Sequence, residues 1–380
     1  KPYRPASVIT VSAMSFGSLS AAAVNAMNNG VRKSGAYQNT GEGGLAPYHK
    51  QGGDVVFHFG TGYFGVRSED GNFSMDKMKQ LVSDNPCIKA IEIKISQGAK
   101  PGKGGVLPAA KITHEISEIR GVVMVKDLLS PATHSAFNSV PELMQLIEDI
   151  AEQTGLPVGI KGAIGKLDQW EELAKLMIET GKGPDFITVD GGEGGTGAAP
   201  PSFADHVSLP WVYGFSSLYK LFKKYDLNER IVFIGSGKLG FPAKAAMAFA
   251  MGVDCINVAR EAMMSIGCIQ AQVCHTNRCP TGIATQSKWL QGGINVPLKS
   301  DRLSQYFKTF RKEFLEITHA AGYEHPCQFT MDDIQVNVDD NDLNRSLSST
   351  YGYNKAVVPF SGIEELYNCS YLGGKEYMEK

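Results

Sequence analysis

Residues 231–258 read IVFIGSGKLGFPAKAAMAFAMGVDCINV, and this stretch decides the fold. It holds an apolar run at 231–234, the glycine-rich loop GSGKLG at 235–240, a stretch with apolar residues three and four positions apart at 242–251, and a second apolar run at 255–258. Short apolar runs bounded by turn residues predict buried strands, and the spacing between them indicates a helix. The stretch is therefore predicted to be a strand–helix–strand unit of a parallel sheet.

The same alternation of strand and helix runs through most of the chain before this point. Eight strands, each followed by a helix, predict a (β/α)8 barrel, whose active site lies at the carboxyl ends of the strands. A doubly wound sheet is the alternative, and it is disfavoured because no G-x-G-x-x-G follows the first strand. The predicted strands are residues 8–11, 36–39, 90–95, 121–125, 157–161, 186–189, 231–234 and 255–258, and helices are predicted at 140–153, 169–180, 242–251 and 302–319.

Composition and charge argue against several classes of protein. With a formal net charge of −2, the 380 residues offer no sign of a basic surface for nucleic acid. No run of eighteen apolar residues is present, so no membrane-spanning helix is expected. The chain begins at Lys1 without an initiator methionine, which indicates a processed form or part of a longer chain, and we expect a cytoplasmic protein.

A cysteine-rich loop follows the last predicted strand. Residues 267–286 read GCIQAQVCHTNRCPTGIATQ, in which Cys268, Cys274 and Cys279 have the spacing C-x5-C-x4-C. Thiolates this close in sequence can converge on one iron–sulfur cluster. The alternatives are zinc, a disulfide and ordinary buried thiols. Zinc sites usually show C-x2-C pairs, and a disulfide is disfavoured because the chain lacks a secretory signal.

Three cysteines favour a three-iron cluster, or a four-iron cluster with a ligand from elsewhere. Cys255 lies in the preceding apolar run, where a core thiol is the better explanation. Because such a cluster moves one electron at a time, the chain is expected to hold a second cofactor that converts single electrons into two-electron chemistry. A flavin is the usual converter.

Glycine-rich loops follow the later strands. GSGKLG at 235–240 and NVARE at 257–261 stand where barrels bind phosphate groups on exposed backbone N–H groups. DGGEGGTGAAP at 190–200 allows backbone to approach a flat ring or a phosphate closely. The structural alternatives are a tight turn for GSGKLG and a flexible loop for DGGEGGTGAAP.

Two further segments complete the predicted organisation. Residues 54–67 (DVVFHFGTGYFGVR) are rich in glycine and aromatic side chains and predict a hairpin inserted in an early loop. We assign residues 1–300 to the barrel, with the cysteine loop 267–286 included, and residues 301–380 to a helical C-terminal extension packed on it.

Five motifs in one order resemble a known family. They are AMSFGSLS at 13–20, NTGEGG at 39–44, EIKISQGAKPGKGG at 92–105, DGGEGGTGAAP and the cysteine loop. Together they are similar to the FMN-binding synthase domain of glutamate synthase, and most similar to its short, archaeal-type branch. The resemblance runs from about residue 12 to residue 286, and more weakly to residue 322.

The resemblance implies the cofactors and their ligands. Reduced FMN, fed by a 3Fe-4S cluster, reduces 2-iminoglutarate, formed from 2-oxoglutarate and ammonia, to L-glutamate. Cys268, Cys274 and Cys279 correspond to the cluster ligands. Lys94 and Lys161 correspond to cations that face the N1–O2 edge of the flavin, where they stabilise the charge of the reduced ring. The remaining implied cofactor-binding residues are Ala13, Met14, Ser15, Gln97, Gly192, Gly194, Gly195, Thr196, Gly235, Ser236, Gly237, Ala259 and Arg260.

The resemblance also implies a site for the 2-oxo acid. The matching positions are Glu42, Lys100, Arg120 and Ser139, and two cations suit a dicarboxylate. For Lys94 and Lys161 the alternative is an ion pair inside the barrel. For Arg120 the alternative is a surface charge, because it ends a polar helix.

Two departures from the family pattern concern the substrate. The usual GGQLPG reads GGVLPA, so that Val106 replaces a glutamine, and SPATHSAFNS at 130–139 keeps His134 but loses a second histidine. His134 is then either a ligand or a structural histidine. These changes leave open a related oxidoreductase, such as an N-methylglutamate-type synthase or dehydrogenase subunit. A non-catalytic electron-relay subunit is a further alternative.

The expected partners follow from what the chain lacks. It shows no second nucleotide-binding motif, which implies ferredoxin or a separate NAD(P)H-dependent flavoprotein as electron donor. It shows no amidotransferase nucleophile, so ammonia is expected to be free or delivered by an amidotransferase partner. No nucleic acid partner is expected.

Overall fold

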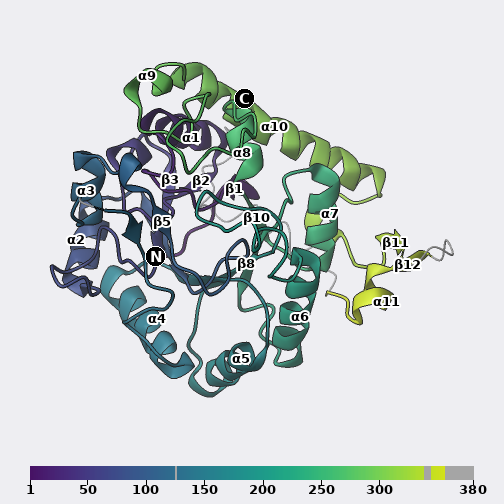
Figure 1. Cartoon of the computed structure of the whole chain (residues 1–380). Coiled ribbons are helices and arrows are strands. Elements are labelled where there is room, and N and C mark those ends of the chain that lie inside the picture. The colour runs from purple at the N-terminus through teal and green to yellow at the C-terminus, as the bar shows by residue number, and fades with distance from the viewer. Residues whose placement is uncertain (125, 338–343, 356–380) are drawn as a thin grey trace.

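The computed structural model describes residues 1–124, 126–337 and 344–355 of the chain. Within them, eight parallel strands close into a barrel surrounded by helices (Figure 1). The predicted (β/α)8 barrel is thereby confirmed. In barrel order the strands are β1 (Ile9–Val11), β2 (Tyr37–Asn39), β3 (Asp54–Phe59), β4 (Ile88–Lys94), β7 (Val158–Gly162), β8 (Phe186–Asp190), β9 (Val232–Ser236) and β10 (Cys255–Val258), which pairs with β1.

The strands are buried on both faces, but the two faces differ in chemistry. Ile91 and Ile93 of β4 are fully buried apolar residues that alternate with Glu92 and Lys94. The Glu92 carboxylate contacts side chains of β2, β3 and β8. Since β2 and β8 are not neighbours of β4, Glu92 must point into the barrel, and the isoleucines therefore face the helices.

The outer helices begin and end at residues suited to those positions. Ser20, Ser74, Ser139 and Asn295 each accept a hydrogen bond from the first turn of a helix. Glycines in the left-handed conformation end several helices, as expected for C-caps. The outer helices are α1 (Ala21–Ser34), α2 (Met75–Asp84), α4 (Val140–Thr154), α5 (Asp168–Thr180), α6 (Trp211–Lys224), α7 (Pro242–Met251) and α10 (Val296–Ala320).

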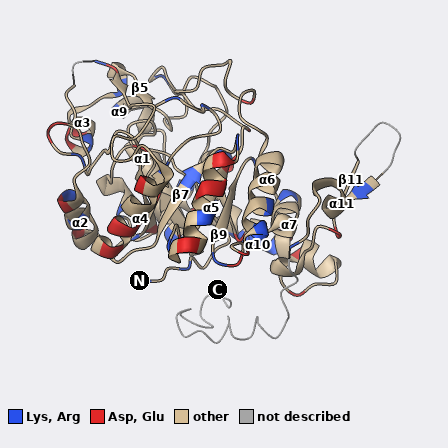
Figure 2. Cartoon of the chain, turned by 90° about the horizontal axis from the view of Figure 1, so that it is seen from below, with Lys and Arg blue, Asp and Glu red and all other residues tan. Residues whose placement is uncertain are grey.

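The loops at the carboxyl ends of the strands carry short elements of their own. Figure 2 shows the barrel from the side, with β5, α3 and α9 at one end and the N-terminus at the other. In the same view α2 and α5 carry both acidic and basic residues, whereas α4 carries acidic residues alone. The short elements are η1 (Pro47–His49), β5 (Val106–Leu107), η2 (Ala109–Lys111), α3 (His114–Arg120), β6 (Leu128–Leu129), α8 (Arg260–Ser265) and α9 (Lys288–Gln291).

Two predictions about the early part of the chain are wrong. Residues 54–67 do not form an inserted hairpin, because β3 within them pairs in parallel with β2 and β4. Residues 121–125 supply no barrel strand in their described part, because Gly121 is the left-handed C-cap of α3 and Val123 is 77% exposed. A short apolar run without clear periodicity does not distinguish a buried strand from an exposed turn.

The last outer helix crosses the expected domain boundary at residue 300. Helix α10 begins at Val296 and packs against α1 and α7, so it completes the ring around the barrel (Figure 1). It contains the predicted helix 302–319. After it, η3 (Pro326–Gln328), β11 (Gln335–Asn337), β12 (Asn344–Ser346) and α11 (Leu347–Tyr351) lie beside α6 and α7. The part of the expected extension at 356–380 lies outside the described residues.

None of the helices in the described part of the chain combines the length and the apolar character that a membrane span requires.

The contact between α1 and α10 provides a test of the fold. Leu303 is fully buried, and a Cβ on Gly30 would lie 2.8 Å from its side chain. We predict that Leu303→Ala lowers the free energy of unfolding by about 2–5 kcal/mol, because it opens a cavity between the two helices. Chemical denaturation measures the change. Leu298→Ala on the same helix is the control, since Leu298 is 54% exposed, and an equal loss in both variants contradicts this packing.

Candidate functional site

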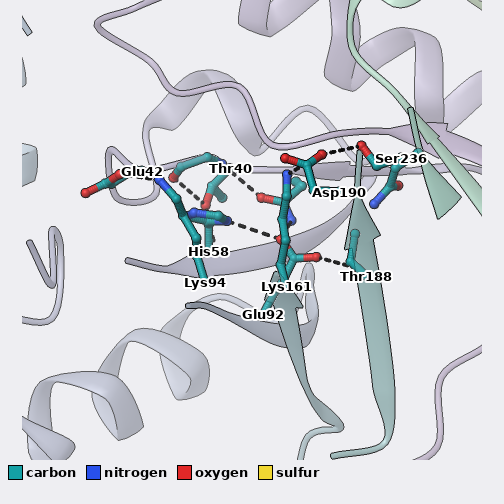
Figure 3. A network of polar contacts seen from close by, with 12 residues as sticks. Thr40, Glu42, His58, Glu92, Lys94, Lys161, Thr188, Asp190 and Ser236 are labelled. Carbon is teal, nitrogen blue, oxygen red and sulfur yellow. Dashed lines mark hydrogen bonds and ion pairs between the residues drawn. The ribbon is translucent and has the colours of Figure 1, made fainter. Parts of the chain in front are cut away.

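Charged side chains meet at the carboxyl ends of four strands (Figure 3). Lys161 of β7 lies 3.6 Å from the Oδ1 atom of Asp190, which ends β8. The same oxygen accepts a hydrogen bond of 2.8 Å from Ser236 of β9. The other Asp190 oxygen accepts one of 2.9 Å from the backbone of Gly98, in the loop after β4. Asp190 therefore joins the carboxyl ends of β7, β8 and β9 to the loop after β4.

A second acid lies deeper in the barrel. Glu92 accepts hydrogen bonds from Asn39 (2.9 Å) and Thr188 (2.8 Å), and its Oε1 atom lies 3.2 Å from Nδ1 of His58 (Figure 3). Burial raises the pKa of Glu92, but His58 and Lys161 outweigh it, so its pKa lies below the ordinary value. Burial lowers the pKa of His58 more than Glu92 raises it. The pair is thus a carboxylate and a neutral imidazole that donates from Nδ1.

Above this layer, Glu42 and Lys94 form an ion pair. The Lys94 Nζ atom lies 3.0 Å from Glu42 Oε2, and the two side chains are 11% and 13% exposed. Burial raises the pKa of Glu42, but Lys94 and a hydrogen bond from Ser130 reverse the shift and hold the pKa at about 2. Glu42 Oε1 is buried and has no hydrogen-bond partner among the described residues. The site therefore offers an ionised carboxylate with one free acceptor.

Two further cations flank this carboxylate. Lys100 is buried, and among the described residues it donates only to the carbonyl of Gly104, at 2.7 Å. Burial lowers its pKa to about 8, an effect that Lys94 reinforces and Glu42 opposes. Arg120 is 3% exposed, so it is not the surface charge that its place at the end of α3 suggested.

The guanidinium of Arg120 is held without a carboxylate. It donates to the carbonyl of Phe16 (2.9 Å) and to the hydroxyl of Ser15 (3.4 Å), and it lies 5.0 Å from the ring centre of Phe64. Burial lowers its pKa to about 10, while Glu42 acts in the opposite direction. Its Nε atom is buried without a partner among the described residues. The Nε–H group of Arg120 is therefore free to donate a hydrogen bond to an anionic group.

Ser139 and His134 have structural contacts. Ser139 is exposed, and its hydroxyl accepts from the backbone of Glu142 at the start of α4, so none of its contacts joins it to Glu42 or Arg120. His134 is buried and stacks 4.7 Å from Phe137. Its Nε2 atom lies 2.8 Å from the carbonyl of Lys94. His134 therefore positions the strand end that carries Lys94.

The segment predicted to contact a flavin lies directly after β1. Ala13 and Met14 are partly buried, and Ser15 is buried. A side chain at Gly41, which has a φ of +63°, would collide with the backbone of Met14 and Ser15. The NTGEGG loop after β2 thus packs directly on this segment. Gln97, partly buried, precedes Gly98, whose backbone binds Asp190.

The predicted phosphate loops come together after β8, β9 and β10. Arg260 begins α8, and a Cβ on Gly194 would lie 3.2 Å from its guanidinium. The Arg260 side chain forms no hydrogen bond or ion pair with any other described residue, although its charge acts on Asp205. Gly194 donates to Asp205 (2.6 Å), which also pairs with Lys238 at 3.0 Å. The other predicted members of these loops are Gly192, Gly195, Thr196, Gly235, Ser236, Gly237 and Ala259.

The three cysteines line one pocket. Cys268, Cys274 and Cys279 share it with mostly apolar side chains, including Met263 and Ile283. Within residues 1–124, 126–337 and 344–355, no group of three or more His, Cys, Asp or Glu side chains is placed to hold a metal ion. A single zinc ion needs each thiolate sulfur to lie about 2.3 Å from it. In a cluster, different thiolates bind different iron atoms and lie farther apart.

Some residues of the site were not found from the sequence. His58 and Glu92 interrupt the apolar runs VVFHF and AIEIK, and a charged or polar residue in a buried strand was an available signal. Asp190 was assigned only as part of a glycine-rich loop. Lys111, which contacts the cysteine loop, lies in the unremarkable stretch PAAKI and gave no signal.

Comparison with known proteins agrees with this geometry. Residues 3–324 match the conserved region in glutamate synthase. The chain belongs to the glutamate synthase family. A glutamate synthase large subunit-like protein, YerD, of Bacillus subtilis (strain 168) is 40% identical over 345 residues, which cover 90% of this chain and 65% of that protein.

A second relative has a lower sequence identity. An archaeal-type glutamate synthase (NADPH) of Thermotoga neapolitana (strain ATCC 49049 / DSM 4359 / NBRC 107923 / NS-E) is 33% identical over 317 residues, or 83% of this chain and 59% of that protein. The chain thus spans about three-fifths of the length of these relatives. A crystal structure of mandelate oxidase shares the fold, with a TM-score of 0.51 and 15% identity over 86% of this chain and 77% of that one.

The contact between the loops after β4 and β8 can be tested by adding one methyl group at Gly98. A Cβ on Gly98 would overlap the carbonyl oxygen of Gly191, which is backbone and cannot rotate away. We predict that Gly98→Ala lowers the free energy of unfolding by more than about 2 kcal/mol. Gly165→Ala is the control, because nothing lies within 4 Å of its Cβ, and we expect a change within about 0.5 kcal/mol. Equal stability of both variants contradicts the loop contact.

Proposed function

We propose that this protein is a glutamate-synthase-like, FMN-dependent oxidoreductase of the class that acts on CH–NH2 groups. In the proposed reaction, 2-oxoglutarate and ammonia form 2-iminoglutarate, which is reduced to L-glutamate. The observation that carries the proposal is the free Oε1 atom of the ionised Glu42, which lies beside buried cations at the mouth of the barrel.

FMN would supply a hydride when bound. The residues at the mouth fit this cofactor in charge and position. Lys94 and Lys161 offer cations to a reduced ring. Arg260 lies at the start of α8 beside Gly194 without an acidic partner in ion-pair range, which suits a phosphate. The segment from Ala13 to Ser15 lies at the end of β1, where a ring could lie over the barrel.

The residues of the oxo-acid site would have different roles. Lys100 and Arg120 would bind the two carboxylates, since their present partners are neutral. Glu42 Oε1 would accept a hydrogen bond from the substrate nitrogen. Because the pKa of Glu42 is about 2, it stays ionised and would stabilise the protonated, more electrophilic form of the imine.

A 3Fe-4S cluster is the proposed source of electrons. Three cysteines from one loop line a common pocket, and a lysine, Lys111, lies against the same loop. This donor set fits a cluster with three thiolate ligands better than a single ion. The electron donor is proposed to be ferredoxin or an NAD(P)H-dependent flavoprotein, and one relative carries NADPH in its name.

A related amino or 2-oxo acid is the second candidate substrate. Val106 is 40% exposed and opens β5. A Cβ on its neighbour Gly105 would lie 3.1 Å from both Glu42 and Ser130. Position 106 thus adjoins the proposed substrate site, where an apolar side chain favours a less polar acid, as in an N-methylglutamate-type enzyme.

Reoxidation of the reduced protein tests the proposal. The purified protein is reduced under anaerobic conditions, and flavin absorbance is followed after addition of 2-oxo acids with and without ammonia. We expect 2-oxoglutarate with ammonia to reoxidise the flavin and release L-glutamate. If no 2-oxo acid reoxidises the flavin in the presence of ammonia, the proposed reaction is wrong.

We predict that Cys274→Ser lowers the iron content of the purified protein while most of the fold remains, because the loop follows the last barrel strand. Iron analysis and circular dichroism measure the two effects. Cys87→Ser is the matched control, since Cys87 is a partly buried thiol at the start of β4, outside this loop. Unchanged iron in Cys274→Ser would rule out the cluster assignment.

We predict that Arg120→Ala weakens 2-oxo acid binding about 30-fold or more, because a desolvated charge pair contributes roughly 2 kcal/mol or more. Flavin fluorescence titration measures the affinity, and the flavin spectrum itself should change little. Since Arg120 also holds Phe16 and Ser15, Lys100→Met is the companion variant. Within the described part of the chain Lys100 donates to Gly104 alone, so the loss of its ammonium group disturbs less of the fold. No effect in either variant contradicts the transferred substrate site.

Val106→Gln distinguishes the two candidate substrates. If 2-oxoglutarate is the substrate, the added amide donates to it and strengthens binding. If the variant loses activity instead, the pocket is built for a less polar acid, and only the cofactor chemistry of the proposal stands.

A further inference from the structure

Lys111 is a buried cation beside the cysteine loop. It lies at the end of η2, is 2% exposed, and donates to three backbone carbonyls: Ser18 at 2.6 Å, Cys274 at 3.0 Å and Ala284 at 3.2 Å. All three protons of its ammonium group are therefore used. No carboxylate lies within ion-pair distance of it in the described part of the chain.

An unmatched buried charge is costly unless an anion lies near. Lys111 donates to the carbonyl of Cys274, and Cys274 and Cys279 line the same pocket. The cysteine sulfurs are thus the anionic groups that can compensate Lys111. Three thiolates that bind a cluster would supply this negative charge permanently.

The same contacts join the cysteine loop to the segment after β1. Ser18 belongs to the stretch that begins with Ala13, while Cys274 and Ala284 belong to the cysteine loop. Further hydrogen bonds reinforce the junction: Asn277 donates to Ala110 at 2.9 Å, and Gln286 donates to Gly17 at 3.0 Å. Lys111 therefore stands where the proposed cluster site meets the proposed flavin site.

We propose that Lys111 is a positioning residue that holds a fixed positive charge against the cysteine loop and thereby raises the reduction potential of the cluster. This inference rests on the proposed function, because it needs the cluster to be present. On reduction the cluster gains one electron and one negative charge. A cation nearby stabilises the reduced form more than the oxidised form, and burial keeps water from screening this effect.

The test is a redox titration of the cluster in the purified holoenzyme, followed by electron paramagnetic resonance. We expect Lys111→Met to shift the one-electron equilibrium toward the oxidised form by tenfold or more, which corresponds to about 59 mV. Lys111→Arg keeps the charge, and its one-electron equilibrium constant should stay within about threefold of that of the wild type. Lys299→Met is the matched control, because Lys299 also lies near this loop, at Gly267, but is partly exposed.

The outcomes separate the inference from the proposed function. A wild-type protein without iron refutes the proposed function, and the inference falls with it. A loaded Lys111→Met variant whose potential equals that of the wild type refutes the inference alone. If Lys111→Met binds no iron, Lys111→Arg decides: a loaded cluster with a near-normal potential supports the role of charge, and loss of iron there as well overturns it.

Discussion

Compensation of buried charge at the carboxyl ends of the strands is the constraint on which this site depends. The ion pair between Lys94 and Glu42 lies at the mouth of a barrel whose interior also holds Glu92 and Lys161 (Figure 3). Each of these groups costs free energy when it leaves water and must be matched by a partner. The strands therefore end where their charged residues can meet, and the loops take their positions from those contacts.

The buried cations fall into two groups. Lys94 and Lys161 have carboxylate partners, Glu42 and Asp190. Among the residues that the structure describes, Lys100, Lys111 and Arg120 have only neutral partners in ion-pair range, namely backbone carbonyls, a hydroxyl and an aromatic ring.

The side chain of Arg260, which is less buried, makes no hydrogen bond or ion pair with the other described residues. The cations without carboxylate partners lie at three separate places. These places coincide with the proposed sites for an oxo acid, a cluster and a phosphate. The distribution of unmatched charge thus supports the proposed oxo-acid, cluster and phosphate sites together.

Much of the fold could be predicted because the barrel strands are short apolar runs separated by amphipathic helices. The prediction fails where apolar runs are ambiguous: the sequence predicts a strand at 121–125, where α3 ends, and a hairpin at 54–67, where β3 (Asp54–Phe59) lies. Charged residues with a place in a motif, such as Glu42 and Lys100, were found. Lys111 was not, because its role arises only when η2 packs against a loop more than 150 residues away.

The central claim is that the unmatched cation at the mouth of the barrel, Arg260, marks the site of an anionic, phosphate-bearing flavin. Mass spectrometry of the cofactor released from the purified protein by denaturation tests this claim most directly. We expect FMN, released without covalent attachment. Recovery of FAD, or of no flavin at all, would contradict the account, because GSGKLG at 235–240, although it fits G-x-G-x-x-G, follows a late strand of a closed barrel and not the first strand of a doubly wound sheet.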